Sequence, residues 1–349
     1  MSGVPILGPP VPTLCERCSI LDLDQPIYLT SLNDTASLCD LCRLLSQCFE
    51  GIDGSNGDDE ATTVHILESQ SRVRVCAAPG EAHHEIQVGF PVLPDQYSPL
   101  RFNLFREWLR VCDEQHKNRD CHLEARTELP TRVVDIGVGY GTGGGENPDL
   151  LRLYVPEPGR RGNYTVLSHC WGRLSDELKR TYCTTRANVG TRCARGFNAG
   201  SLPRTFRDAI RVTRELGVRY IWIDSLCIVQ DDEGDWARES RRMETAFRNA
   251  YCTIAAASAK DSTKGFLGRA TATREPYVMV RTSSHGPVYI CGFVDDFERD
   301  VERDSVLNKR AWVLQERALS RRTIHFTAGQ TYWECGNGIR CETLTSMRR

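Results

Sequence analysis

The chain has 349 residues, a length typical of two domains or of one domain with a substantial N-terminal extension. Hydrophobic residues make up 40% of it and charged residues 26%, which is ordinary for a globular protein with a core. The net charge of −2 excludes a global field that would draw the protein to nucleic acid or a membrane, and no run approaches the ~20 apolar residues of a membrane span.

The N-terminal residues MSGVPILGPPVPTL lack the basic start and long apolar run of a secretory signal peptide. In a chain without such a signal, sixteen cysteines favour reduced thiols, some of them metal ligands, over a disulfide framework. We therefore expect a cytoplasmic protein.

Residues 1–60 are predicted to form a cysteine-rich, zinc-binding region. Two CxxC pairs, Cys15 with Cys18 and Cys39 with Cys42, are separated by twenty residues. Each pair can form a knuckle with two thiolates, so together they can close a tetrahedral zinc site. Four thiolates leave no open position, so the predicted zinc is structural. Burial of four reduced cysteines without a metal is the alternative.

Residues 61–150 are predicted to hold short strands, a helix and a linker. The glycine-rich loop GIDGSNGDDE (51–60) precedes three alternating runs, TVHILE, RVRVCA and EIQVGF, which are typical of antiparallel strands. FNLFREWLRVC (102–112) has helical spacing. GVGYGTGGGENPD (137–149) contains a formal GxGxxG, but no helix follows the glycines, so we interpret it as a linker.

The helix at 102–112 leads to three further candidate metal ligands, Cys112, His116 and Cys121. They could belong to a second metal site. The sequence shows no fourth ligand, so packing in the core is the favoured interpretation.

From residue 151 the pattern changes to alternating strands and helices. The stretch 202–217 has helical spacing, with Pro203 in its first turn and Gly217 at its end. The other predicted elements are strands at LRLYV (151–155), YTVLS (164–168), VRYIWIDSLCIVQ (218–230) and CTIAAA (252–257), and a second helix capped by Asp235. This order predicts an α/β domain over 151–349 with a doubly wound parallel sheet.

Polar residues follow the strand at 164–168. In a doubly wound sheet, ligands bind at the carboxyl ends of the strands, near the point where the strand order reverses. The candidate binding residues are Ser168, His169, Cys170, Trp171 and Gly172, together with Asp224 in the next strand. We expect them to converge on one rim. Neighbours on a strand point to opposite faces, which disfavours a catalytic pair of Cys170 and His169.

Four segments in order resemble the HET (heterokaryon incompatibility) domain of filamentous fungi. They are YTVLSHCWG, LPRTFRDAIRVTRELGVRYIWIDSLCIVQDDEGDW, METAFRNAYCTIAAAS and RAWVLQERALSRR, over about residues 164–322. The stretches WLRVCDEQHKNRDC, LPTRVVDIG and TYWECG also lie where HET proteins have similar segments. His169 departs from the family, which often has tyrosine there, and this puts a role specific to that side chain in doubt.

The resemblance implies a role in the cell death that follows fusion of genetically different fungal cells. HET domains are regarded as distant relatives of TIR domains, which have a flavodoxin-like order. Several TIR domains cleave NAD+ with a glutamate in a Trp-Cys-x-x-Glu helix. Trp312 and Glu316 keep this spacing, with Val313 in place of the cysteine. Residues four apart share a helix face, so the resemblance implies a catalytic Glu316 with Trp312 beside the substrate.

On this hypothesis one carboxylate is sufficient, because nicotinamide departs as a neutral molecule and needs no general acid. The turn at 168–172 would approach the phosphates or the ribose through backbone NH groups, with Gly172 permitting close approach. Trp312 and Trp171 would stack on a flat ring. Asp224 would orient a hydroxyl or an arginine, and a plain salt bridge is the alternative.

A second hypothesis is a non-catalytic, TIR-like signalling module that acts by self-assembly and partner recruitment. Trp312 and Glu316 would then serve packing and salt bridges, and QDDEGDW (230–236) would be an assembly surface. Both hypotheses involve self-association and an incompatibility partner protein. A zinc-dependent nucleic-acid binder is disfavoured, because no element carries a basic stripe with interleaved aromatics. TLTSMRR (343–349) is not an obvious natural domain end, so a truncated chain is a further expectation.

Overall fold

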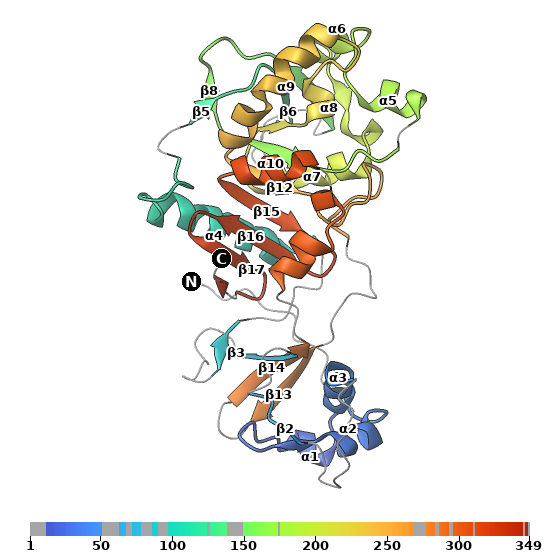
Figure 1. Ribbon diagram of the computed structural model, residues 1–349, viewed down its shortest axis with the longest axis vertical. Coiled ribbons are helices and arrows are strands. Elements are labelled where there is room, and N and C mark those ends of the chain that lie inside the picture. Colours follow the sequence, from blue (N-terminus) through green and yellow to red (C-terminus); the bar gives the residue numbers. More distant parts are fainter. Residues whose placement is uncertain are drawn as a thin grey trace. The chain divides into compact units, whose positions relative to one another are not determined.

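The computed structural model describes residues 12–50, 63–67, 72–77, 86–89, 97–123, 126–137, 149–173, 175–268, 277–282, 286–292, 296–309, 311–344 and 346–347. The chain forms two compact units, each with a hydrophobic core (Figure 1). Their ranges are Met1–Pro94, Ala272–Asp296 and Glu342–Thr345 for the first unit, and Asp95–Thr271, Phe297–Cys341 and Ser346–Arg349 for the second.

These units divide the chain differently from the predicted segments 1–60, 61–150 and 151–349. The late strands β13 (Tyr277–Thr282) and β14 (Gly286–Gly292) belong to the first unit, because β14 pairs with β3 (Val73–Ala77). Helix α4 (Pro99–Gln115) belongs to the second unit, where its aromatic side chains pack on the large sheet. The predicted loop at 51–60 and the interior of the predicted linker, 138–148, lie outside the described residues.

The first unit is built around a four-stranded sheet in the order β13-β14-β3-β4. Strand β4 runs parallel to β3, so the antiparallel prediction is wrong for this pair, whereas β13, β14 and β3 are antiparallel. Helix α3 buries Leu41, Leu44 and Leu45 in the core of this unit. The elements are α1 (Glu16–Ser19), β1 (Ile27–Tyr28), α2 (Leu29–Thr35), α3 (Asp40–Cys48), β2 (Thr63–Val64), β3 (Val73–Ala77), β4 (Gln87–Val88), β13 (Tyr277–Thr282) and β14 (Gly286–Gly292).

The second unit contains a ten-stranded mixed sheet in the order β10-β7-β6-β11-β9-β12-β15-β16-β17-β18. Its strands are β6 (Val133–Asp135), β7 (Leu150–Tyr154), β9 (Tyr164–Ser168), β10 (Phe197–Asn198), β11 (Tyr220–Trp222), β12 (Cys252–Ala255), β15 (Arg322–Phe326), β16 (Thr331–Cys335), β17 (Gly338–Cys341) and β18 (Ser346–Met347). A separate pair joins β5 (Thr127–Glu128) and β8 (Arg161–Gly162).

The predicted parallel sheet is confirmed only at the centre of this sheet. Strands β11, β9, β12 and β15 are parallel neighbours, and β9 is buried along its whole length. The flanking strands are antiparallel, including β7, which contains most of the predicted parallel strand LRLYV. On one side the reason is local: β15, β16 and β17 follow one another through short connections, which permit only antiparallel pairing.

The helices of the second unit cover both faces of the sheet. They are α4 (Pro99–Gln115), α5 (Asp176–Tyr182), α6 (Val189–Ala194), α7 (Arg204–Glu215), α8 (Asp224–Cys227), α9 (Glu233–Arg248) and α10 (Ala311–Leu319), with shorter turns η1 (Ala199–Ser201), η3 (Glu298–Arg303) and η4 (Leu307–Lys309). Phe105 of α4 packs on Phe326 of β15, and the hydroxyl of Thr213 on α7 is hydrogen-bonded to that of Thr165 on β9. Helices α9 and α10 lie on the opposite face, and Figure 1 shows α10 in front of the strands and α4 behind them.

The sequence patterns located most of these elements. Helix α7 is confirmed between Pro203 and Gly217, and Gly217 has the positive φ of +72° that such an end requires. The predicted strand at 218–230 is too long, because α8 begins two residues after β11 ends. Asp232, and not Asp235, caps α9 by accepting from the backbone N–H of Asp235 over 3.0 Å.

The strand order identifies where a ligand would be expected. The chain passes from β9 to β11 on one side and then to β12 on the other, with α7 and α9 on opposite faces. The order of the sheet therefore reverses between β9 and β12. Ser168 at the end of β9 is in register with Ala255 at the end of β12.

Candidate functional site

The carboxyl end of β9 meets helix α10 through a hydrogen bond. The Oγ of Ser168 donates to Oε2 of Glu316 over 2.5 Å, although 148 residues separate them. Ser168 is 3% exposed, and Glu316 is half-buried. A short bond from a hydroxyl to a carboxylate is of the strong, charge-assisted kind. The structure thus brings the predicted binding residue Ser168 next to the predicted catalytic residue Glu316.

A second pair of predicted residues meets at the same edge of the sheet. Nε1 of Trp171 donates to Oδ2 of Asp224 over 2.8 Å, and the backbone N–H of Ser225 donates to Oδ1 of Asp224 over 2.6 Å. These residues follow the ends of two neighbouring parallel strands, β9 and β11. The sequence suggested a hydroxyl or an arginine as the partner of Asp224, whereas the observed partner is the indole of Trp171.

His169 and Cys170 point to opposite faces of the sheet, as the alternation along a strand requires. The ring of His169 meets Phe206 of α7 edge to face, with 5.0 Å between centroids. Cys170 packs instead with Ala255, Leu307 and other apolar residues on the α10 face. Both side chains are buried, so their predicted contact with a substrate stays a prediction.

Gly172 is needed for two structural reasons. Its φ is +74°, a conformation that L side chains rarely adopt. A Cβ at this position would also lie 2.3 Å from Cβ of Asp261, in the segment after β12. The close approach that Gly172 permits here is therefore to Asp261, and an approach to a ligand stays a prediction.

Helix α10 carries the two residues of the predicted Trp-x-x-x-Glu motif. Trp312 lies on the helix by its backbone, and its side chain is outside the part of the chain that the structure describes. Val313, which replaces the cysteine of the TIR motif, is 4% exposed and packs with Cys170. The helix thus closes over the end of β9.

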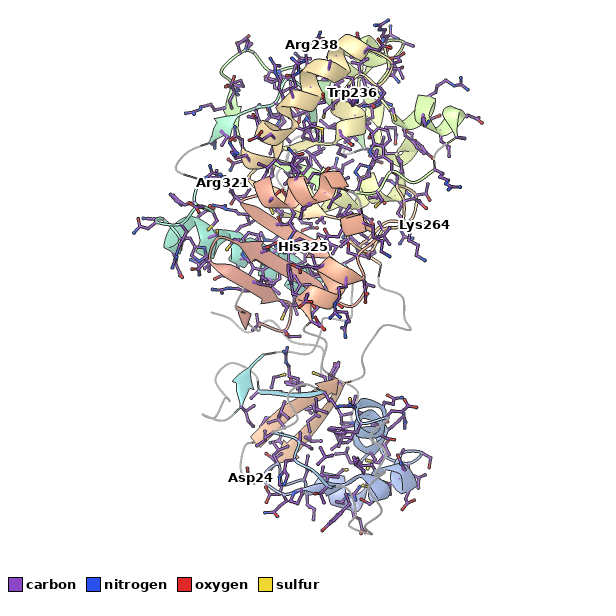
Figure 2. All side chains as sticks on the ribbon, in the orientation of Figure 1. Asp24, Trp236, Arg238, Lys264, Arg321 and His325 are labelled. Carbon is purple, nitrogen blue, oxygen red and sulfur yellow. The ribbon has the colours of Figure 1, made fainter. Side chains whose placement is uncertain are left out.

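The sequence did not reveal a charged network next to Glu316. The guanidinium of Arg317 donates to both carboxylate oxygens of Glu334, over 2.9 and 3.1 Å, and His325 on β15 (Figure 2) lies 2.9 Å from the same carboxylate. Burial by itself would raise the pKa of Glu334, but His325 and Arg317 outweigh it and hold that pKa well below its usual range. ERALSRR and TYWECG contain the charged residues, but only the pairing of β15 with β16 brings them together.

A small cavity lies between Ser168 and this network. It has a volume of about 10 Å³ and is lined by Arg317, His325, Leu307, Val313 and other residues of this face. This volume is about enough for one water molecule, whereas ligand pockets usually measure about 300–1,000 Å³. The arrangement described here is therefore closed to a nucleotide.

Two larger cavities of the second unit lie away from Ser168 and Glu316. One, of about 490 Å³, lies between the loops at 128–131 and 155–158 and helix α9. The other, of about 530 Å³, is lined mainly by basic side chains, namely Lys117, Arg119, Arg126, Arg161 and Arg321, with Asp120 and His122 among them. Neither cavity contains a predicted site residue.

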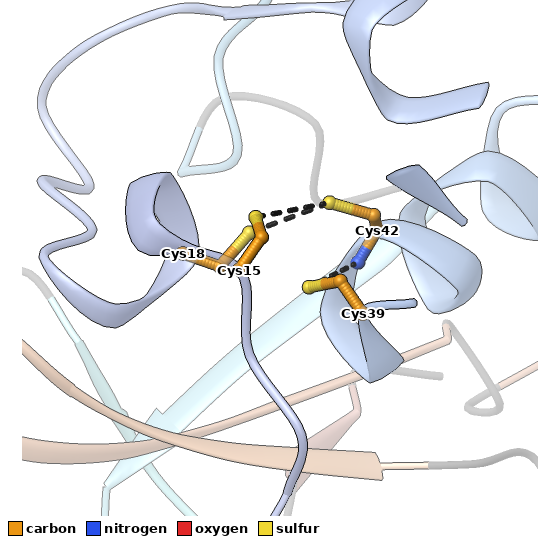
Figure 3. A group of neighbouring side chains, drawn as sticks. All are labelled: Cys15, Cys18, Cys39 and Cys42. Carbon is orange, nitrogen blue, oxygen red and sulfur yellow. Dashed lines mark hydrogen bonds between the residues drawn. The ribbon is translucent and has the colours of Figure 1, made fainter. Parts of the chain in front are cut away.

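The four predicted zinc ligands of the first unit converge (Figure 3). The Sγ of Cys42 lies 3.9 Å from that of Cys15 and 3.5 Å from that of Cys18. The backbone N–H of Cys42 donates to Sγ of Cys39 over 3.5 Å. All four thiols are free. This cluster could bind a metal ion such as zinc.

The thiols of this cluster differ: backbone donors favour the thiolate of Cys39, the form that binds metal, whereas burial raises the pKa values of Cys18 and Cys42. Burial by itself would raise the pKa of Cys39, but backbone N–H groups of Cys15 and Cys42 lower it to about 7. Nη2 of Arg17 donates to Sγ of Cys42 over 3.6 Å. A buried group of thiols thus has a cation and backbone donors beside it.

The three candidate ligands at the end of α4 also have a neighbour that the sequence did not indicate. Cys335, at the end of β16, joins Cys112, His116 and Cys121 in one buried cluster. A fourth candidate ligand was therefore missed in the sequence analysis. It was missed because 214 residues separate Cys121 from Cys335 along the chain, and only the fold brings them together.

The comparison with known families identifies the central part of the second unit. Residues 164–316, from the first residue of β9 to Glu316, match the family described as Heterokaryon incompatibility protein (HET). No curated protein and no solved structure matches the chain. Among the helices that the structure describes, none has the length and apolar character to cross a bilayer. The chain contains a HET domain at residues 164–316.

Proposed function

We propose that the protein is a cytoplasmic effector of cell death in heterokaryon incompatibility, and that its HET domain hydrolyses NAD+ to nicotinamide and ADP-ribose. The observation that carries this proposal is the hydrogen bond from Ser168 to Glu316, which fixes a carboxylate at the edge of the sheet where a ligand is expected. The family match supports the role in incompatibility.

The order of the parallel strands supports a TIR-like fold. In chain order β9, β11, β12 and β15 are the first to fourth parallel strands, and in space they lie in the order 2-1-3-4. Flavodoxin-like sheets begin with the same order and bind their ligand between the first and third strands. In this protein those strands are β9 and β12, and Glu316 is held at the end of β9.

In the proposed reaction Glu316 stabilises the cationic sugar. The bond between C1′ of the ribose and the nicotinamide nitrogen breaks, and its electron pair returns to the pyridine ring, which leaves as neutral nicotinamide. Water then attacks C1′ and loses a proton to Glu316 or to solvent. NAD+ and water thus give nicotinamide, ADP-ribose and a proton. A preorganised carboxylate in a site with little water stabilises positive charge more effectively than one in bulk water.

The neighbouring residues have supporting roles in this proposal. Ser168 orients the carboxylate of Glu316 by donating to one of its oxygens. Trp171 stacks on a flat ring of the substrate, and Asp224 holds its indole in position. Trp312 lies four residues before Glu316 and is proposed to line the same site.

Opening of the site is part of the proposal, because a cavity of about 10 Å³ cannot admit a dinucleotide. Leu307 and Val313 cover the end of β9 and must move for NAD+ to reach Glu316. We propose that self-association, or binding of an incompatibility partner protein, stabilises the open arrangement. A ligand or partner can shift such an equilibrium only as far as it prefers the open state.

Release of nicotinamide from NAD+ tests this proposal, with Glu316→Gln as the decisive variant. Glutamine keeps the size of the side chain and an oxygen that can accept from Ser168, but it removes the negative charge. Glu244→Gln is the matched control, because Glu244 is an exposed residue of α9 that pairs only with Arg248 in the described residues. Loss of release in the first variant alone supports catalysis by Glu316.

A non-catalytic signalling module is the second candidate, and the exposure of Trp236 favours it. This side chain lies on α9 (Figure 2) and is 54% exposed. A large exposed aromatic residue at the end of the QDDEGDW segment suits a contact between copies. If Trp236→Ala abolishes self-association while the wild type releases no nicotinamide, the signalling module is the better account.

We also propose that Cys15, Cys18, Cys39 and Cys42 hold a structural Zn²⁺ ion. The four sulfur atoms converge from two knuckles, and a backbone N–H donates to one of them. Metal binding would supply much of the stability of this small unit, because a closed four-thiolate site links α1 to the start of α3.

A further inference from the structure

The donors of the second cysteine cluster come from separate parts of the second unit. Cys112 lies in the last turn of α4, and His116 follows the end of that helix, four residues later. Cys121 lies in the next loop, and Cys335 ends β16. Their exposed fractions are 0, 7, 0 and 3% in this order. Four donor groups therefore meet in a place closed to solvent.

The distances within this cluster suit a metal ion. Nδ1 of His116 lies 3.3 Å from Sγ of Cys112, 3.6 Å from that of Cys121 and 3.8 Å from that of Cys335. In a tetrahedral zinc site with ordinary bond lengths, an imidazole nitrogen and a thiolate sulfur are about 3.6 Å apart. The observed values bracket this distance.

A disulfide framework cannot account for the cluster. All three cysteines are free, and three thiols cannot all be consumed by pairing with one another. Plain packing explains other buried cysteines of this unit, such as Cys227 and Cys252, which belong to no such group in the described residues. It does not explain why an imidazole nitrogen and three sulfur atoms converge on one point.

The surroundings of the cluster are those of a metal centre. The backbone N–H of Asn337 donates to Sγ of Cys335 over 3.4 Å, and a Cβ at Gly336 would lie 3.3 Å from the backbone nitrogen of Cys121. The guanidinium of Arg322 is fully buried and donates from Nε to the carbonyl of Cys121 over 2.9 Å. Three thiolates and a divalent ion carry a net charge of −1. Arg322 offsets part of that charge, since its Nη1 also pairs with Asp113 over 2.7 Å.

We propose that Cys112, His116, Cys121 and Cys335 bind a second Zn²⁺ ion, in a Cys₃His site. Four protein ligands leave no open position, so this zinc is structural. It fastens the loop at 117–121 and the end of β16 to the last turn of α4. The proposal is independent of NAD+ cleavage and of the zinc site in the first unit.

The test is a measurement of zinc content and zinc ligands in the full chain purified without chelators. We expect two zinc ions per chain, and X-ray absorption at the zinc edge should show seven sulfur and one nitrogen ligands over the two ions. In Cys15→Ser/Cys18→Ser we expect one remaining zinc with three sulfur ligands and one nitrogen. One zinc in the wild type, with sulfur ligands alone, would overturn the proposal without any variant.

Variants of the second site change the zinc content or the zinc ligands. A residue that only packs in the core would change neither. His116→Cys should retain two zinc ions and replace the nitrogen signal by an eighth sulfur. Cys335→Ser should lose one zinc ion, whereas Cys252→Ser, the control for an equally buried cysteine, should keep both. If Cys335→Ser does not fold, the ligand count of the wild type and of His116→Cys decides. An unchanged spectrum in His116→Cys would contradict the assignment of His116 as a ligand.

Discussion

The hydroxyl of Ser168 donates to the carboxylate of Glu316 over 2.5 Å and joins the first parallel strand of the HET domain to its last helix. Ser168 lies four residues after the start of the matched region, and Glu316 is its last residue. The proposed catalytic carboxylate is therefore positioned by a contact that exists only when the whole domain is folded.

Ser168→Ala is expected to reduce nucleotide binding and nicotinamide release, because Glu316 loses the donor that orients it. The cost in stability should be small, about 1–2 kcal/mol, since one hydrogen bond is removed and no large cavity is created. Calorimetric titration with NAD+ and thermal unfolding measure the two effects. Global unfolding of the variant would assign Ser168 a structural role instead.

Glu334→Ala should destabilise the second unit by about 3–5 kcal/mol, because it leaves the Arg317 cation and the His325 imidazole without their buried carboxylate. Urea unfolding measures the loss. Glu302→Gln is the control: Glu302 is 44% exposed and pairs with the same arginine over 3.0 Å, so its removal should cost no more than about 1 kcal/mol. Equal effects of both changes would contradict the central role of Glu334.

The same carboxylate predicts acid sensitivity. The folded-state pKa of Glu334 lies below its unfolded value of 4.5, so its contribution is complete above that pH. As the pH falls below this value toward the folded-state pKa, the unfolded chain takes up a proton first and the contribution is lost. Unfolding free energies of the wild type should therefore fall more steeply below about pH 4.5 than those of Glu334→Gln. Parallel curves for the two proteins would be evidence against this origin of acid sensitivity.

Gly172→Ala should lower stability by more than Gly217→Ala does. Both glycines have φ above +70°, so both substitutions carry backbone strain of about 1–2 kcal/mol. Only at Gly172 would the new Cβ also meet Cβ of Asp261, at 2.3 Å, whereas nothing lies within 4 Å of a Cβ at Gly217. Thermal unfolding should show the larger decrease for Gly172→Ala. A smaller decrease than in Gly217→Ala would contradict the contact with Asp261.

Cys15→Ser/Cys18→Ser should remove one zinc ion and unfold the first unit, because its small core depends on the closed site. Limited proteolysis should then cleave within residues 12–50 while the HET domain stays resistant. Cys48→Ser is a suitable control, since Cys48 lies in the same unit but outside the cluster. A double variant that retains the zinc content of the wild type would exclude the predicted ligands.

The sequence predicted what local patterns determine. The apolar run YTVLS marked a buried strand, and the spacing of Pro203, Phe206 and Gly217 marked α7. The spacing of the two CxxC pairs predicted that their four cysteines converge, because each pair forms a knuckle within a few residues.

Features that depend on pairing between distant segments could not be predicted. The partner of Glu334 depends on the register of β15 with β16, and Cys335 reaches His116 only after the sheet has formed.

Nicotinamide release from NAD+ by assembled wild-type protein and by Glu316→Gln is the most direct test of the proposed activity. The assay should include a crowding agent, since we propose that the site opens on self-association. The account predicts release by the wild type and a decrease of at least ~100-fold in a folded Glu316→Gln protein, the scale expected when an electrostatic stabiliser of the transition state is removed. Absence of release from assembled wild-type protein, or equal release from both proteins, would contradict it.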